Sequence, residues 1–117
     1  MNTILVVDDE EKIRSVYERI LKREGFNVLD AGNAKDAHEL LIKNNVDLIL
    51  LDINMAEVDG TVLYKIINTF FPHAKVIVSS VYHMDDQKVL IKGATDYYDK
   101  SDSIKVLVHK VKEVPKN

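Results

Sequence analysis

The most apolar run of this sequence is Val46-Asp47-Leu48-Ile49-Leu50-Leu51, and it ends at Asp52. An apolar strand without regular polar alternation is typical of a sheet that is covered on both faces, as parallel sheets are. We therefore expect residues 46–51 to form a central strand, with the acid at its carboxyl end.

Apolar runs on both sides of this stretch predict further strands. They are Ile4-Leu5-Val6-Val7, which stops at Asp8-Asp9-Glu10; Phe26-Asn27-Val28-Leu29; Val76-Ile77-Val78, which ends in Ser79-Ser80; and Asp96-Tyr97-Tyr98-Asp99. The run at residues 26–29 is weaker and more alternating, so we expect it at an edge of the sheet.

Between the strands, apolar residues recur at the spacing of helices that bury one face. The predicted buried stripes are Ile13, Val16, Tyr17, Ile20 and Leu21; Ala34, Ala37, Leu40 and Leu41; Leu63, Ile66, Ile67 and Phe70; and Ile104, Leu107, Val108 and Val111. The predicted boundaries are a C-terminal cap at Gly25, an N-cap at Asn33, a cap at Asp85 or Asp86 on a short helix that stops at Gly93, and helix stops at Pro72 and Pro115.

Strands that alternate with helices at this spacing predict right-handed βαβ units and a parallel sheet. The expected fold class is therefore α/β, with an open doubly wound sheet of five parallel strands, because 117 residues fall short of an eight-stranded barrel. The length corresponds to one domain, and no linker, low-complexity stretch or repeat interrupts it.

The composition argues against several classes of function. A formal net charge of -3 offers no general case for nucleic-acid binding, and the absence of cysteine excludes disulfides and thiolate metal sites. No apolar run approaches the ~20 residues that a membrane helix needs, and the N-terminus has no signal-peptide pattern. We therefore expect a cytoplasmic protein that contacts neither nucleic acid nor membrane directly.

The residues that finish the strands carry the functional information, because ligands of open α/β sheets bind outside the carboxyl ends of the strands. These residues are Asp8, Asp9, Asp52, Ser80 and Lys100. Strand ends also turn polar simply on reaching water, which would explain any one of them. It explains the whole set less well, since apolar strands lie directly behind these residues.

Neighbouring carboxylates repel one another unless a cation is bound or one acid is protonated. Mg²⁺ takes oxygen ligands and typically combines one or two carboxylates with waters and a phosphate oxygen. Phosphoryl transfer is catalysed mainly by positioning and by neutralising charge on the transferred oxygens, and a carboxylate can attack phosphorus. The strand-end residues therefore predict a Mg²⁺-dependent site that forms an aspartyl phosphate.

Several segments together resemble the response-regulator receiver family of two-component signalling. They are Val6-Val7-Asp8-Asp9-Glu10, Leu50-Leu51-Asp52-Ile53-Asn54-Met55, Asp59-Gly60, Val76-Ile77-Val78-Ser79-Ser80, Gly93-Ala94 and Tyr97-Tyr98-Asp99-Lys100. The resemblance runs from Thr3 to about Val114. It implies a (βα)5 flavodoxin-like fold with strand order 2-1-3-4-5, and a single receiver domain over residues 1–117 without an effector domain, similar to chemotaxis and sporulation regulators.

The resemblance also implies a role for each acidic residue of the site. Asp52 would be the phosphoacceptor. Mg²⁺ would be bound directly by Asp9 and largely through water by Asp8. Asp52 and the backbone carbonyl of Asn54 would complete the protein ligands of the metal.

By the same resemblance, Ser80 would hydrogen-bond a phosphoryl oxygen and Lys100 would pair with the phosphoryl group. Tyr97 would be the aromatic switch residue, which turns inward after phosphorylation. Hydrogen bonds to charged groups contribute roughly 1.5–3 kcal/mol each, so two of them approach the roughly 5.5 kcal/mol that reverses a 1:99 equilibrium.

The implied partners are a histidine kinase or histidine phosphotransfer protein, a downstream protein target or effector domain, and a second copy in a phosphorylation-dependent dimer. The lysines of the basic C-terminal helix are Lys105, Lys110, Lys112 and Lys116. They complement the helix dipole, which favours a solvated face. Alternatively, they form a docking surface with Lys88, Lys92 and Tyr97, because the family places output contacts on its last two helices.

Three positions depart from the family pattern. Ser101 replaces a proline that commonly has a cis bond, and we expect a trans bond here because the cis form before a non-proline residue costs ~2.5–4 kcal/mol. Ala56 also replaces a usual proline and would loosen the loop beyond Asp52. Val81 replaces a small residue and either narrows access to Asp52, slowing phosphorylation and hydrolysis, or is accommodated by a shift of the loop.

Other functions fit parts of the pattern. A Mg²⁺-dependent phosphatase of the haloacid-dehalogenase type would need a second acid where this chain has Asn54. A flavodoxin-like cofactor-binding protein would need a phosphate loop where this chain has acids after the first strand. A degenerate receiver acting as a scaffold conflicts with the full set of acids. Tyr82 and His83, beyond Ser80, either cover the site or form an ordinary exposed loop.

Overall fold

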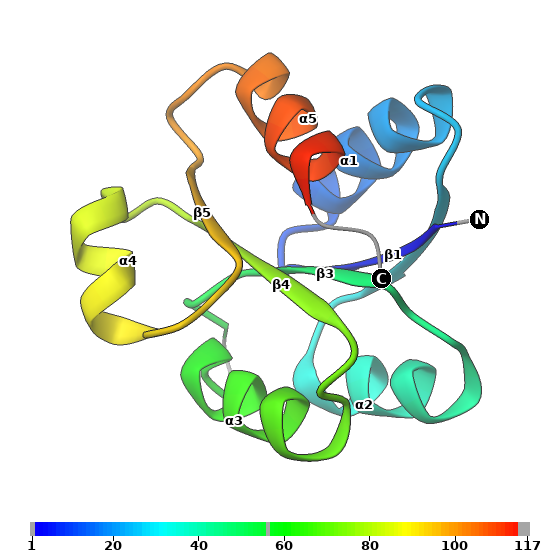
Figure 1. Cartoon of the computed structure of the whole chain (residues 1–117), viewed down its shortest axis with the longest axis vertical. Helices are drawn as coiled ribbons and strands as arrows, with labels where there is room; N and C mark the ends of the chain where they lie inside the picture. Colours follow the sequence, from blue (N-terminus) through cyan, green and yellow to red (C-terminus); the bar gives the residue numbers. More distant parts are fainter. Residues whose placement is uncertain (1, 56, 115–117) are drawn as a thin grey trace.

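The chain folds into five strands that alternate with five helices, and a computed structural model describes residues 2–55 and 57–114 (Figure 1). The elements are β1 (Thr3–Val7), α1 (Glu11–Arg23), β2 (Asn27–Ala31), α2 (Ala34–Lys43), β3 (Leu48–Leu51), α3 (Gly60–Phe70), β4 (Lys75–Ser80), α4 (Met84–Leu90), β5 (Asp96–Asp99) and α5 (Ile104–Glu113).

The strands form one parallel sheet in the order β2-β1-β3-β4-β5, which confirms the predicted fold class and strand order. The weakly apolar strand β2 lies at an edge, as its alternation predicts. Strand β3 lies at the centre, and all four of its residues are buried. It begins at Leu48 rather than at Val46, and the preceding Asp47 accepts a hydrogen bond from the Thr3 backbone amide at 2.8 Å.

The sheet separates two apolar cores, because successive side chains of a strand point to opposite faces. One core joins β1, β3 and β4 to α2 and α3 through Leu5, Val7, Ile49, Leu51, Val76, Val78, Ala37, Leu41, Leu63 and Ile67. The other joins the same strands to α1 and α5 through Ile4, Val6, Leu48, Leu50, Ile77, Tyr17, Leu21, Leu107 and Val111. Figure 1 shows these helix pairs on opposite faces of the sheet.

Two predicted helix boundaries are confirmed by their geometry. Asn33 caps α2, since its side chain accepts a hydrogen bond from the Asp36 amide at 2.8 Å. Gly25 follows the end of α1 with φ 95°, a left-handed conformation that glycine adopts without steric cost. The predicted cap of α4 at Asp85 or Asp86 is wrong: His83 is the N-cap residue, and both acids lie in the first turn, where they still favour the helix dipole.

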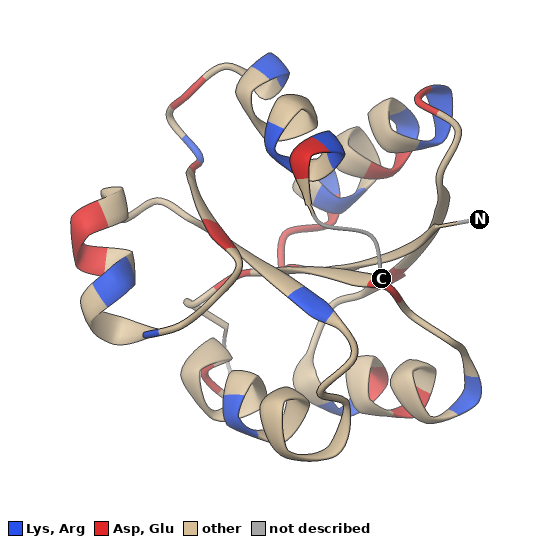
Figure 2. Cartoon of the chain, in the orientation of Figure 1, with Lys and Arg blue, Asp and Glu red and all other residues tan. Residues whose placement is uncertain are grey.

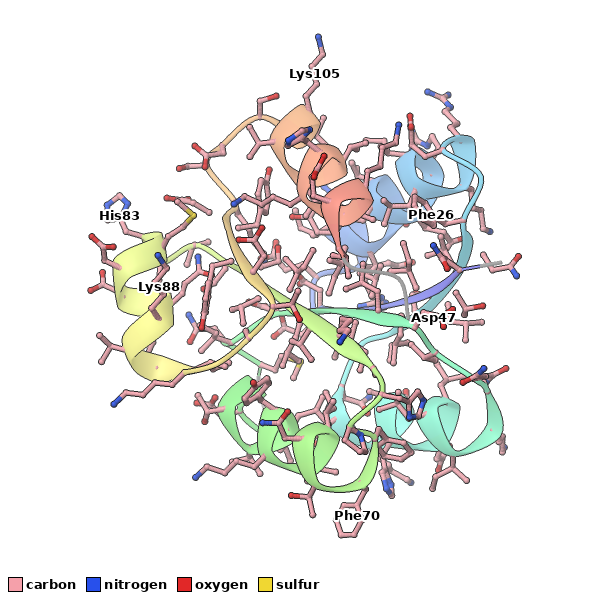
Figure 3. All side chains as sticks on the ribbon, in the orientation of Figure 1. Phe26, Asp47, Phe70, His83, Lys88 and Lys105 are labelled. Atoms are coloured by element: carbon pink, nitrogen blue, oxygen red, sulfur yellow. The ribbon has the colours of Figure 1, made fainter. Side chains whose placement is uncertain are left out.

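Two members of the predicted buried stripes are wrong. Val16 is 40% exposed and Phe70 is 70% exposed. Both lie at the margin of an apolar stripe, where helix rotation relative to the sheet decides burial. Phe70 points away from the body of the protein (Figure 3).

The part of the chain that the structure describes contains no cis peptide bond, as expected for the bond that precedes Ser101. None of its helices is long and apolar enough to cross a membrane. The expectations for Ala56, Pro115 and Lys116 lie outside the described residues.

Candidate functional site at the carboxyl edge of the sheet

Asp8 and Asp52 are brought together by the hydrogen-bond ladder of the sheet. Asp8 directly follows β1, and its amide donates to the Ala31 carbonyl of β2 at 3.1 Å. Asp52 directly follows β3, and its amide donates to the Val7 carbonyl of β1 at 3.0 Å. The two acids therefore leave neighbouring strands at the same level, and both side chains are buried.

Lys100 reaches both of these acids from the end of β5. Its Nζ lies 2.6 Å from Asp8 Oδ2 and 3.5 Å from Asp52 Oδ2. Burial lowers the pKa of the Lys100 ammonium, but the hydrogen bond to Asp8 and the charges of both acids outweigh it, so the pKa lies above its ordinary value. The amide of Lys100 donates to the Ser80 carbonyl at 2.8 Å, which fixes the start of the side chain.

Lys100 compensates the negative charge of Asp52 only in part. Burial raises the pKa of Asp52 most, and the neighbouring Asp8 raises it further, while Lys100 lowers it. The balance raises the pKa of Asp52 from 3.8 to about 6. A further cation at this site would therefore relieve an unfavourable buried charge.

The loop that follows β1 forms an acidic cluster, which Figure 2 shows between β1 and α1. Carboxylate oxygens of Asp8, Asp9 and Glu10 lie within 4.8 Å of one another. Asp8 is buried, whereas Asp9 and Glu10 are exposed. Clustered carboxylate oxygens that are open to water suit a hard divalent cation such as Mg²⁺, so the donor set fits that metal.

Ser80 is completely buried at the end of β4, and its Oγ accepts a hydrogen bond from the Tyr82 amide at 3.3 Å. The Tyr82 hydroxyl reaches across to Asn54 Oδ1 at 3.5 Å, so this side chain extends from the loop after β4 to the loop after β3. Val81 lies between Ser80 and Tyr82 in the sequence, and it is 64% exposed.

His83 belongs to the same loop but extends away from the site (Figure 3). Its side chain is 86% exposed, and its Nδ1 lies 3.2 Å from Asp99 Oδ2. Two further hydrogen bonds to Asp99 come from the amide and the hydroxyl of Ser101. These bonds lower the pKa of Asp99, with the Ser101 hydroxyl as the largest cause.

Tyr97 is buried, but no hydrogen bond joins it to Ser80 in the described part of the chain. Its hydroxyl donates to the Ile91 carbonyl at 2.7 Å and accepts from the Ala94 amide at 3.2 Å. The Lys88 Nζ lies 5.9 Å from the centre of its ring. The structure therefore places the candidate switch residue against the segment between α4 and β5.

Asp59 and Gly60, which follow Asp52 in the sequence, each have a structural role at the start of α3. A Cβ at Gly60 would lie 2.1 Å from the Asp52 carbonyl oxygen, which leaves no room for any side chain. The Asp59 side chain caps α3 by accepting from the Thr61 amide at 2.7 Å. The start of α3 is thus packed directly against the backbone of Asp52.

Sequence reasoning missed Gln87, a completely buried residue of α4. Its Nε2 donates to the Tyr82 carbonyl at 2.7 Å and to the Tyr98 carbonyl at 2.9 Å, so it ties the loop after Ser80 to strand β5. A single polar residue in a short helix carries no signal of such a role.

A second polar contact lies inside the core on the α1 side. The Tyr17 hydroxyl is 3.2 Å from Ser79 Oγ, and both residues are buried. The periodicity correctly predicts that Tyr17 faces the core, but it does not reveal this partner, which lies 62 residues away in the sequence. Burial raises the pKa of Tyr17 most, while the hydrogen bond shared with Ser79 and the charge of Lys100 lower it.

Comparison with known proteins finds one family across nearly the whole chain. The family described as "Response regulator receiver domain" matches residues 4–112. A response regulator from Rickettsia bellii, described as NtrX-like, is 35% identical over 97% of this chain and 25% of its own length. The transcriptional regulatory protein SrrA of Staphylococcus aureus is 46% identical over 50% of this chain and 24% of its own length. The chain thus spans about a quarter of the length of these curated relatives.

Solved structures share both the fold and part of the sequence. The response regulator protein TrrA from Thermotoga maritima, solved in complex with Mg²⁺-BeF, is 31% identical with a TM-score of 0.84, and the match covers 98% of this chain and 100% of that one. A CheY-like receiver domain from Methanospirillum hungatei is 29% identical with a TM-score of 0.89, covering 97% of this chain and 92% of that one.

Proposed function

Because the chain belongs to the response regulator receiver family, we propose that it accepts a phosphoryl group on Asp52 from a histidine kinase or a histidine phosphotransfer protein. It is a signalling module of two-component systems rather than a classical enzyme. We propose that its own chemistry is limited to self-phosphorylation and autodephosphorylation. As one domain, residues 1–117 would pass the signal to a protein target or an effector domain.

One observation carries this proposal: Lys100 Nζ lies within 2.6 Å of Asp8 and 3.5 Å of Asp52 at the carboxyl edge of the sheet. A buried ammonium beside a buried nucleophilic carboxylate can receive an oxygen of the transferred phosphoryl group. A purely structural ion pair would not need the further acids that lie beside it.

The residues that would hold Mg²⁺ are Asp8, Asp9, Asp52 and the backbone carbonyl of Asn54. When bound, the ion would neutralise charge on the phosphoryl oxygens. Support comes from the acidic cluster and from the raised pKa of Asp52, which burial causes first and Asp8 second. Support also comes from TrrA, which is 31% identical and was solved with Mg²⁺-BeF.

In the transfer itself, a carboxylate oxygen of Asp52 forms a bond to phosphorus with one of its lone pairs. The bond from phosphorus to the donor breaks, and its electron pair leaves with the donor, either a histidine nitrogen or an acetate oxygen. Lys100 pairs with one phosphoryl oxygen, and the Ser80 hydroxyl donates a hydrogen bond to another.

The switch would follow from these new contacts. Ser80 Oγ, which accepts from the Tyr82 amide at 3.3 Å, would move toward the phosphoryl group and draw the loop after β4 with it. Tyr97, which is already buried, would then give up its hydrogen bond to Ile91 and turn toward Ser80. The altered surface would include α4 and α5 and would bind a protein target or a second copy of the chain.

The phosphatase alternative requires a general acid at the position of Asn54, and a side-chain amide cannot act as a general acid. The scaffold alternative requires a defective site, whereas Lys100 contacts both Asp8 and Asp52 here. Neither alternative is favoured by a contact in the structure.

The proposal is tested by incubating the protein with acetyl phosphate and Mg²⁺ and measuring its intact mass beside an Asp52→Asn variant. We expect one phosphoryl group on the wild type only, and none after removal of Mg²⁺. Equal modification of both proteins would show that Asp52 is the wrong residue. If neither protein is modified, beryllofluoride binding distinguishes a site that needs its kinase from an inactive one, and Val81→Ala tests whether the valine blocks access.

A further inference from the structure

Arg14 of α1 contacts the backbone of the acidic loop, residues 8–10. One of its guanidinium nitrogens, Nη1, donates to the Asp8 backbone carbonyl at 2.7 Å, and its Nε donates to Asp30 Oδ2 of β2 at 3.0 Å. Only 17% of its side chain is exposed. The guanidinium thus joins three segments: the first turn of α1, the loop of residues 8–10 and the end of β2.

Gly32 makes room for this arrangement. A Cβ at position 32 would lie 3.0 Å from Arg14 Nη1, and the three nearest atoms all belong to the Arg14 guanidinium. Gly32 does not have a positive φ, unlike Gly25 and Gly93. Its backbone therefore does not require glycine, but a Cβ at this position would force the Arg14 guanidinium to move by a few tenths of an ångström.

The contact matters because Asp8 is held through its backbone as well as its side chain. The Asp8 amide donates to Ala31 at 3.1 Å, and Asp8 Oδ1 accepts from the Glu10 amide at 2.9 Å. Lys100 holds the other carboxylate oxygen, Asp8 Oδ2, at 2.6 Å, and Arg14 adds a restraint on the Asp8 backbone carbonyl. Together these bonds set the direction in which the oxygens of residues 8–10 face.

We propose that Arg14 is a positioning residue for the cation site, because it clamps the Asp8 carbonyl against β2 and so holds the loop of residues 8–10 in the geometry that binds Mg²⁺. The inference rests on the proposed function, which supplies the cation. Residues that orient the ligands of a metal from behind typically change metal affinity about 10–100-fold when they are removed.

Charge and geometry predict opposite effects at this position, which makes the inference testable. Arg14 is a cation beside a cation site. If it acted only through its charge, Arg14→Ala would remove repulsion and tighten Mg²⁺ binding. If it positions the loop, the same variant weakens Mg²⁺ binding.

The experiment is a titration of the full chain with MgCl₂, followed through the backbone amide signals of Asp9 and Glu10 by NMR. We expect Arg14→Ala to weaken Mg²⁺ binding about tenfold. Arg14→Lys keeps the charge but cannot make both hydrogen bonds of the planar guanidinium, so it should give an intermediate loss.

Gly32→Ala tests the same contact without changing any charge. The added Cβ crowds the guanidinium of Arg14 and should weaken Mg²⁺ binding about threefold or more, in the direction of Arg14→Ala. Arg19→Ala is the matched control, because the side chain of this exposed arginine of α1 makes no hydrogen bond or ion pair among the described residues. Its Mg²⁺ affinity should equal that of the wild type.

Thermal unfolding of each variant in a chelator separates loss of fold from loss of metal binding. If Arg14→Ala and Gly32→Ala bind Mg²⁺ as tightly as the wild type or more tightly, the positioning role is wrong, even if both variants are less stable. If the wild type itself shows no Mg²⁺-dependent shift of these amides, the proposed function fails, and the role of Arg14 fails with it.

Discussion

Burial and the neighbouring charge of Asp8 both raise the pKa of Asp52. The carboxylate is 5% exposed, and Asp8 lies at the end of the adjacent strand. Lys100 offsets only part of this rise in pKa, because its Nζ lies closer to Asp8, at 2.6 Å, than to Asp52, at 3.5 Å. A nucleophile that attacks phosphorus must be ionised, so this residue combines a reactive role with a cost to stability.

The cost predicts how stability depends on pH in the absence of metal. Burial first, and Asp8 second, raise the pKa of Asp52 from 3.8 to about 6, so between these values the folded protein binds a proton that the unfolded chain does not. The free energy of unfolding therefore falls as pH rises through this window. Above it, the loss approaches about 2–3 kcal/mol, since each pKa unit corresponds to about 1.4 kcal/mol.

Asp52→Asn removes this ionisation. We expect urea unfolding in a chelator at about pH 7.5 to show the variant more stable than the wild type by about 1–3 kcal/mol, and the difference to shrink at about pH 4. A variant that is no more stable at the higher pH would contradict the raised pKa.

Among the elements, α4 depends most on a single buried polar contact. The helix has seven residues and no side-chain hydrogen bond at its N-cap, so its own hydrogen bonds contribute little. Gln87 attaches it to the loop after β4 and to β5 through the carbonyls of Tyr82 and Tyr98. The element that follows Ser80 is therefore held in place mainly by tertiary contacts.

We predict that Gln87→Leu destabilises the protein by about 2 kcal/mol, because leaving a buried carbonyl without its donor costs about 1–3 kcal/mol. The measurement is urea unfolding at neutral pH. Val89→Leu is the matched control, since Val89 lies in the same helix and is 72% exposed, and it should change stability by less than about 0.5 kcal/mol. Equal effects of the two substitutions would show that the contacts of Gln87 add nothing to α4.

At the scale of the whole molecule, two cores share one sheet. Ile49 of β3 belongs to the core beneath α2 and α3, whereas Ile77 of β4 belongs to the core beneath α1 and α5. The two strands are hydrogen-bonded neighbours in the sheet. Neither core can lose its strands without exposing the other. The domain should therefore unfold in a single cooperative step.

Ile49→Ala and Ile77→Ala test this coupling, since both side chains are fully buried. Each should destabilise the protein by about 2–5 kcal/mol. In each variant, far-UV circular dichroism and tyrosine fluorescence should report the same unfolding midpoint. Separate midpoints in one variant would show that one face of the sheet unfolds independently of the other.

Much of this architecture could be predicted from the sequence, because its signals are local. Apolar runs such as residues 48–51 and helical spacing such as Tyr17 to Leu21 predict the order and type of the elements without knowledge of the fold. The polar residues that finish the strands were predictable for the same reason, since the carboxyl ends of parallel strands share one edge.

Only the tertiary structure decided which side chains meet. Lys100 and Asp8 are 92 residues apart, and their contact depends on the strand order and on the path of the loop after β5. The exposure of Phe70, the partners of Gln87 and the approach of Arg14 to Gly32 likewise depend on how helices are rotated against the sheet. Periodicity places a residue on one side of a helix, but packing between distant segments determines what that residue touches.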